Sequence, residues 1–134
     1  MPNPILVVED NEDLSILFSL VLESAGYQVK TAENARKALE FLSQNKPQLI
    51  LMDVMMPGTN GLQLTRAIKE QSDYQSLPVI LVSAIDRLKD EQLQHSKADD
   101  IIYKPFDLDD LLSRVADLVS SPTRTLGSSI GGSI

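Results

Sequence analysis

Asp53 is the residue of this chain whose type and position most directly indicate chemistry. It ends an unbroken apolar run that begins at residue 49, and a Pro57-Gly58 turn follows it. An apolar run bounded by a turn is typical of a strand buried on both faces, as in parallel sheets. The carboxyl end of such a strand is where open α/β sheets bind ligands. Aspartate also caps turns, so residue 53 alone leaves the chemical and the structural interpretation equally open.

Four further polar side chains stand where other predicted strands end: Glu9, Asp10, Ser83 and Lys104. The carboxyl ends of parallel strands share one edge of a sheet, so we expect these side chains to converge near Asp53. Clustered carboxylates repel one another, and protonation or a bound cation relieves the repulsion. Oxygen ligands with open positions suit Mg²⁺, which is often shared with a phosphate. A lysine and a hydroxyl can then neutralise and hydrogen-bond that phosphate.

Each of these residues also has an ordinary structural interpretation. Glu9 and Asp10 can cap the following helix, because an acidic first turn is favoured by the helix dipole. Ser83 can be a turn residue, and Lys104 can be a solvated lysine before a proline. Four independent accidents do not explain their joint occurrence on one edge. The set therefore predicts an acidic metal pocket beside a phosphate pocket.

A series of alternating strands and helices must position this edge. Short apolar or alternating runs predict strands at 5–8, 27–31, 49–53, 78–82 and 100–104. Helical spacing of apolar residues predicts helices at 14–25, 35–42, 64–68, 86–96 and 108–119. Asn11 or Asp10, Asn34 and Asp107 are the candidate N-caps. Five strand–helix repeats with short connections predict a doubly wound α/β domain with helices on both faces of a parallel sheet.

Composition limits the classes of function. The chain has 134 residues, which fits one domain, and a formal net charge of -7. That charge argues against direct nucleic-acid binding and against binding to an anionic membrane. The absence of cysteine excludes disulfides, thiolate metal sites and cysteine nucleophiles. No secretory signal or membrane-spanning run is recognised, so we expect a cytoplasmic protein.

The end of the chain differs in composition from the rest. After Ser120 the sequence is rich in Ser and Gly and shows no periodicity. We expect a single folded domain over residues 1–120 and a flexible tail or linker over 121–134.

Four motifs in register resemble the response-regulator receiver domain of two-component signalling, as in chemotaxis regulators, from about residue 3 to about residue 120. They are Val7-Val8-Glu9-Asp10-Asn11, the stretch 51–61 around Asp53, Val82-Ser83-Ala84, and Tyr103-Lys104-Pro105-Phe106. The resemblance implies a flavodoxin-like five-stranded sheet of order 2-1-3-4-5 with five helices. It also implies a cis peptide bond before Pro105.

The resemblance assigns a role to each residue of the edge. Asp53 would accept a phosphoryl group from a histidine kinase or a histidine phosphotransfer domain. Mg²⁺ would be held by Asp10, by Asp53 and by the backbone carbonyl of Met55, with Glu9 acting through water. Lys104 would pair with the phosphoryl oxygens, and Ser83 would hydrogen-bond them. The domain would be a regulatory phosphoacceptor that catalyses only its own phosphorylation and dephosphorylation, not a turnover enzyme.

Two positions depart from the family pattern. Ile101 stands where the family usually has Tyr or Phe, three residues before the lysine, and an isoleucine is stiff at χ1 and has no hydroxyl. Tyr103 projects from the same strand face, so it either takes over the aromatic role or covers the edge of the sheet. Lys97 replaces a glycine that is common before Ala98-Asp99. His95, the sole histidine, is interpreted as a solvated helix residue.

Three other functions compete with the phosphorylation switch. A Mg²⁺-dependent hydrolase with an aspartate nucleophile usually has a second carboxylate two residues later, where this chain has Met55. A flavin carrier needs a hydroxyl-rich phosphate loop, and Glu9-Asp10-Asn11 would repel its phosphate. A receiver that is not phosphorylated and binds proteins constitutively is the remaining alternative.

The output partner is expected to be a protein. By resemblance, it would bind the face formed by the helix after Ser83, the strand at 100–104 and the last helix. A homodimer is a further possibility.

Overall fold

The computed structural model describes residues 3–84 and 89–127. Its main sheet has five parallel strands, and they follow the spatial order β2-β1-β3-β6-β7. In chain order these strands are β1 Ile5–Val8, β2 Val29–Ala32, β3 Leu49–Asp53, β6 Val79–Ser83 and β7 Asp100–Tyr103. A two-stranded hairpin, β4 Met55–Met56 with β5 Thr59–Asn60, forms a separate sheet. Without this hairpin the order is the 2-1-3-4-5 that the resemblance implied.

The described part of the chain has five α-helices, of which the first four connect strands and the last follows β7: α1 Glu12–Ser24, α2 Ala35–Gln44, α3 Gly61–Lys69, α4 Asp90–Ser96 and α5 Leu108–Gly127. A short 3₁₀ helix, Ser72–Tyr74, follows α3. Of the two candidate N-caps of α1 the structure has Asn11, and α2 is capped by Asn34 as predicted. Their side chains accept the backbone N–H groups of Leu14 and Lys37 at 2.9 Å. Within the described residues, no helix is long and apolar enough to cross a membrane.

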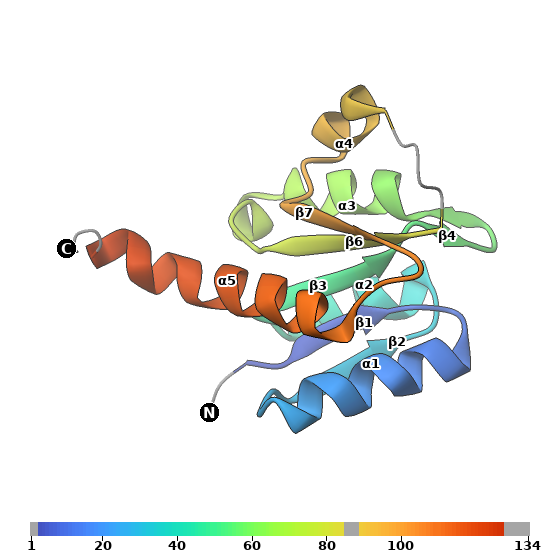
Figure 1. The fold of residues 1–134 in the computed structure, drawn as a ribbon. Helices are drawn as coiled ribbons and strands as arrows, with labels where there is room; N and C mark the ends of the chain where they lie inside the picture. Colours follow the sequence, from blue (N-terminus) through green and yellow to red (C-terminus); the bar gives the residue numbers. More distant parts are fainter. Residues whose placement is uncertain (1–2, 85–88, 128–134) are drawn as a thin grey trace.

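The helices cover both faces of the sheet (Figure 1), and each face has its own hydrophobic core. On one face α1 and α5 contribute Phe18, Leu22, Leu111 and Val115. On the other face α2 and α3 pack through the following side chains: Ala38, Leu42, Leu62, Leu64 and Ile68. Strands β1, β3 and β6 are buried throughout because they are covered on both sides, which explains their unbroken apolar sequence.

Some boundaries differ from the predictions. The helix predicted at 86–96 begins at Asp90, and residues 85–88 lie outside the described residues. Helix α5 continues through residues 121–127, so it covers the first part of the segment expected to be a flexible tail. Residues 128–134 lie outside the described residues, and the domain boundary at residue 120 stays a prediction. The hairpin β4–β5 was not predicted. Its turn contains Gly58 at φ 73, a conformation that glycine adopts without steric cost.

Candidate functional site

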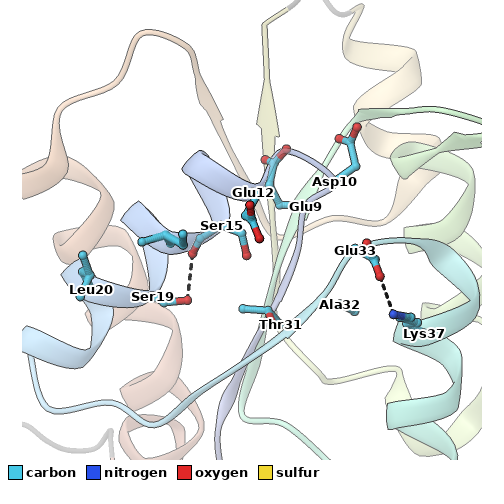
Figure 2. Close-up of a pocket in the computed structure, with 11 residues that line it drawn as sticks. Glu9, Asp10, Glu12, Ser15, Ser19, Leu20, Thr31, Ala32, Glu33 and Lys37 are labelled. Carbon is cyan, nitrogen blue, oxygen red and sulfur yellow. Dashed lines mark hydrogen bonds and ion pairs between the residues drawn. The ribbon is translucent and has the colours of Figure 1, made fainter.

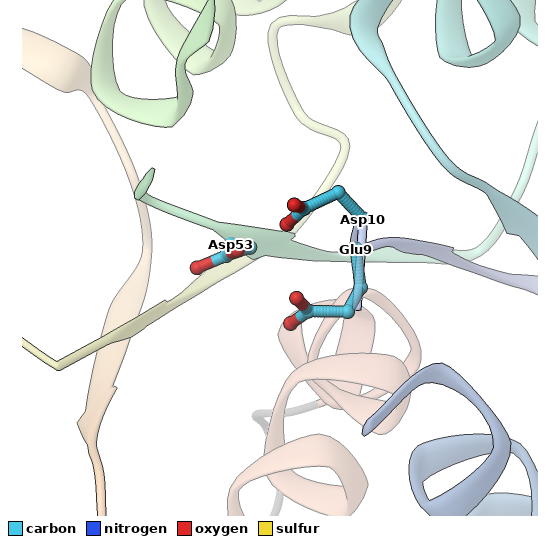
Figure 3. A group of neighbouring side chains, drawn as sticks. All are labelled: Glu9, Asp10 and Asp53. Atoms are coloured by element: carbon cyan, nitrogen blue, oxygen red, sulfur yellow. The ribbon is translucent and has the colours of Figure 1, made fainter. Parts of the chain in front are cut away.

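The register of β1 against β3 brings two acidic residues together. Val8 pairs with Met52, so Glu9 and Asp53 follow at the same level on neighbouring strands. Asp10 is the next residue, and ligand oxygens of all three carboxylates lie within 4.8 Å of one another. Figure 3 shows the three side chains gathered at the ends of these strands. Glu9 and Asp53 are buried, and Asp10 is exposed at the mouth of the cluster.

Strands β6 and β7 supply the basic and hydroxyl groups of the same edge. Ser83 pairs in register with Tyr103, and its carbonyl accepts the backbone N–H of Lys104 at 2.8 Å. The Lys104 Nζ atom lies 3.9 Å from Asp53 Oδ1. The peptide bond between Lys104 and Pro105 is cis, as the resemblance implied. The four strand ends thus converge as the sequence predicted, with a cation facing the buried carboxylate.

Burial and crowding shift the proton equilibria of the cluster. The pKa of Glu9 is raised to about 7, chiefly because the side chain is buried and also because the negative charge of Asp53 lies nearby. The backbone N–H of Asn11, which donates to Glu9 Oε2 at 3.2 Å, and the charge of Lys104 oppose this rise. The pKa of Asp53 is also raised, chiefly by burial, although Lys104 and the backbone N–H of Met55 act in the opposite direction. The cluster therefore lacks enough positive charge of its own to ionise fully.

Comparisons with known proteins agree on one family. The model of the response regulator receiver domain matches residues 5–116. This chain belongs to the response regulator receiver domain family. The receiver domain is 33% identical over 121 residues to the DNA-binding dual master transcriptional regulator RpaA of Synechocystis sp., a match that covers 90% of this chain and 50% of RpaA. It thus spans about half the length of the curated relatives that it first matches.

Solved structures of receiver domains share the fold. The receiver domain of a signal transduction histidine kinase from Syntrophus aciditrophicus is 36% identical with a TM-score of 0.81, covering 98% of this chain and 99% of that one. The response regulator protein TrrA from Thermotoga maritima, solved in complex with Mg²⁺-BeF, is 30% identical with a TM-score of 0.78. That match covers 87% of this chain and 98% of TrrA. The flavodoxin-like fold predicted from the motifs is confirmed.

The acidic cluster of this receiver domain fits a magnesium ion. All three side chains offer oxygen ligands, which Mg²⁺ prefers, and they leave positions open for water or a phosphate. Glu9 Oε1 is buried and has no hydrogen-bond partner among the described residues. A buried acceptor without a partner is costly, and a cation or a water bound to that cation would satisfy it. The structure places Met55 two residues beyond Asp53 in β4, with its side chain 60% exposed.

Sequence reasoning did not identify Gly61 as a residue of the site. Its N–H donates to the carbonyl of Val54 at 2.7 Å, which brings the start of α3 against the back of Asp53. A Cβ atom at residue 61 would lie 2.2 Å from the carbonyl oxygen of Asp53 and 2.8 Å from Val54 Cα. Only glycine therefore allows this close approach. The sequence motif around Asp53 ended on Gly61, but nothing in the spacing of its residues indicated that Gly61 approaches the Asp53 carbonyl.

A groove of about 470 Å³ opens beside the acidic cluster of the receiver domain. It starts at Glu9 and Asp10 and runs between α1 and β2 toward the first turn of α2 (Figure 2). Ile16 and Leu20 of α1 form part of its lining and are 52% and 60% exposed. The two side chains are four residues apart, so they lie on the same side of α1 and form a small exposed apolar area along the groove.

Proposed function

We propose that this receiver domain is a phosphorylation-dependent signalling switch whose phosphoacceptor is Asp53. The observation that carries the proposal is the placement of a buried carboxylate at a strand end, with the Lys104 amine 3.9 Å away and two further carboxylates beside it. Phosphoryl transfer requires mainly alignment and charge neutralisation. The strand ends supply the alignment, Lys104 supplies part of the neutralisation, and a cation held by the carboxylates would supply the rest. The donor would be a phosphohistidine of a histidine kinase or of a histidine phosphotransfer domain, in the cytoplasm.

The transfer exchanges one bond for another. The P–N bond of the phosphohistidine breaks, and the imidazole leaves with the electron pair and takes up a proton. A P–O bond forms at a carboxylate oxygen of Asp53, which gives an acyl phosphate. Hydrolysis of this acyl phosphate by water later returns the Asp53 carboxylate and inorganic phosphate. The domain therefore acts on itself and has no substrate that it turns over.

Each residue of the edge has a role in this proposal. Lys104 would neutralise the phosphoryl oxygens, and the Ser83 hydroxyl would hydrogen-bond them. Asp10, Asp53 and the Met55 carbonyl would hold Mg²⁺, with Glu9 acting through water. When bound, the ion supplies further neutralisation of the charge on the transferred group.

The new phosphoryl charge would change the surface that other proteins bind. The structure supports α4, β7 and α5 as this output face, because β7 is an edge strand next to Ser83 and Lys104. A second copy of this chain is one candidate partner on this face. A phosphoryl group adds strong acceptors that reorder neighbouring segments. Ile101, half-buried in β7, cannot act as a hydrogen-bonding reporter, whereas Tyr103 in register with Ser83 can.

The direct test is phosphorylation of the isolated chain. Incubation with Mg²⁺ and acetyl phosphate, a small acyl phosphate, should add the mass of one phosphoryl group to the wild-type chain. Asp53→Asn and chelation of Mg²⁺ should each prevent the gain. No gain in the wild-type chain would favour the second candidate, a receiver that is not phosphorylated and binds proteins constitutively. The observation that favours this second candidate is Ile101 at the usual aromatic position.

A further inference from the structure

Two aromatic rings connect the segments that carry the opposite charges of the site. Phe18 lies in α1, the helix that begins two residues after Asp10. Phe106 lies two residues after Lys104, in the connection between β7 and α5. The rings are stacked, with their centroids 5.3 Å apart and their planes inclined by 19°. Stacked aromatic pairs stabilise a contact beyond the effect of burying their area.

One ring of the pair belongs to the core, and the other belongs to the loop. Phe18 is only 1% exposed and packs under the sheet among the side chains of β1, β3 and β6. Phe106 is half-buried and packs against the same cluster. The stack therefore attaches the connection at 104–107 to a part of the molecule that cannot shift without opening the core.

Lys104 lies between two points at which its segment is attached to the rest of the fold. Its backbone is held on the side of the sheet by the hydrogen bond from its N–H to the Ser83 carbonyl. Toward α5, Phe106 is the residue of the connection that packs against the core. The side chain of Lys104 has four rotatable bonds, and its amine stands 3.9 Å from Asp53 Oδ1, beyond ordinary hydrogen-bond distance. A small shift of its Cα atom therefore changes how well the amine reaches the phosphoryl group.

We propose that Phe18 and Phe106 are positioning residues for Lys104, and that their stack holds the lysine amine toward Asp53. The effect on phosphoryl transfer rests on the function proposed above, whereas the placement of the amine does not. Neither ring contacts the transferred group in this proposal. Their action passes through the backbone of the connection between Lys104 and Phe106.

The test combines Phe106→Leu with Lys104→Ala. Because Phe106 is half-buried, Phe106→Leu should fold. It should slow phosphorylation by acetyl phosphate about tenfold, since small misplacements of catalytic groups carry penalties of this order. In a Lys104→Ala background it should slow the reaction no further, because two residues that act through one group are not additive.

Phe106→Tyr, which keeps the ring, should restore the wild-type rate. Leu112→Ala is the matched control. Leu112 is a half-buried residue of α5 that packs against the same cluster, and its replacement should leave the rate of phosphorylation unchanged.

A second readout requires no phosphorylation. Lys104 lowers the pKa of Asp53, so carbon NMR of the Asp53 carboxyl group in metal-free protein reports the distance of the amine. Phe106→Leu should raise this pKa toward the value in Lys104→Ala, and Leu112→Ala should not. The proposal would be overturned if Phe106→Leu left the pKa of Asp53 unchanged. It would also be overturned if Phe106→Leu slowed phosphorylation equally in the wild-type chain and in Lys104→Ala. If the wild-type chain gains no phosphoryl group, the proposed function fails, and the titration still decides whether the rings position Lys104.

Discussion

Glu9 and Asp53 leave adjacent parallel strands at the same level, because Val8 and Met52 are register partners in β1 and β3. Both side chains are buried, and both have raised pKa values. Two carboxyl groups brought together in this way make the metal-free protein sensitive to pH. The same contact creates the ligand set for a cation. The pairing would therefore destabilise the metal-free protein, and a bound cation would offset this cost.

The first prediction concerns the stability of metal-free protein between pH 4.5 and pH 7. The folded pKa of Glu9, about 7, lies above its ordinary value of 4.5, so the folded state binds more protons in this window. The contribution of Glu9 to stability is therefore fully present below pH 4.5 and is lost as the pH rises through 7. The loss is at most about 3 kcal/mol, since one pKa unit corresponds to ~1.4 kcal/mol. Urea unfolding in the presence of a chelator, at pH 5 and pH 7.5, measures it.

Glu9→Gln is the control for this pH dependence. It removes the titrating group with little change of shape, so the difference in unfolding free energy between the two pH values should shrink. Mg²⁺ should stabilise the wild-type chain more at pH 7.5 than at pH 5, because protons compete with the ion for the same carboxylates. An equal difference in unfolding free energy between pH 5 and pH 7.5 in the wild-type chain and in Glu9→Gln would contradict the conclusion that Glu9 causes the pH dependence.

The second prediction concerns Gly61. Gly61→Ala places a Cβ atom 2.2 Å from the Asp53 carbonyl oxygen, and backbone atoms cannot rotate away as a side chain can. We expect a loss of about 1–3 kcal/mol in unfolding free energy, the usual cost of overpacking, together with weaker Mg²⁺ binding in calorimetry. Gly58→Ala is the matched control, because nothing lies within 4 Å of its Cβ. Its positive φ carries a cost of about 1–2 kcal/mol, but Mg²⁺ affinity should not change. Equal Mg²⁺ affinities in all three proteins would show that Gly61 does not support the site.

The third prediction separates the chemistry from the docking of a partner. Leu20→Glu adds a negative charge to the exposed apolar part of α1, along the groove that opens beside the acidic cluster. Transfer from a phosphorylated histidine kinase should slow at least about tenfold, equivalent to ~1.4 kcal/mol, while phosphorylation by acetyl phosphate should not change. Leu39→Glu, at an exposed leucine of α2, serves as the control. A Leu20→Glu protein that accepts phosphoryl groups from the kinase at the wild-type rate would rule out this surface.

The fourth prediction concerns an ion pair away from the site. The Lys69 amine is buried and donates to Asp99 Oδ2 at 2.8 Å and to the Leu77 carbonyl at 2.7 Å. The same Asp99 oxygen accepts the N–H of Val79 at 2.8 Å, so the pair joins α3 to the start of β6. Asp99→Asn leaves the buried charge of Lys69 without its partner and should cost about 2–3 kcal/mol in unfolding free energy.

An exposed ion pair provides the comparison. Glu33 and Lys37 form an i,i+4 pair at the surface of α2, and Glu33→Gln should cost less than ~1 kcal/mol. Both variants can be measured by urea unfolding at neutral pH. If Asp99→Asn costs no more than Glu33→Gln, burial does not strengthen the Lys69–Asp99 contact as proposed.

The sequence by itself predicted most of the elements and the residues that gather at the carboxyl ends of the strands. Unbroken apolar runs predicted strands at 5–8 and 49–53, and the structure has both with these bounds. Asn11 and Asn34 identified two helix starts, because their side chains satisfy backbone N–H groups locally. The residues at the strand ends were recognised because parallel strands must share one edge. The strand order itself came from the family resemblance.

Only the tertiary structure decided the contacts that set the distances between these residues. The register that places Glu9 beside Asp53, the stack of Phe18 on Phe106, and the approach of Gly61 to the Asp53 carbonyl join residues that no local pattern relates. Local periodicity reports which face of an element is buried, but it contains no information about which distant residue that face meets. The sequence thus names the groups that could hold a phosphoryl group, and packing between distant segments sets where each group stands.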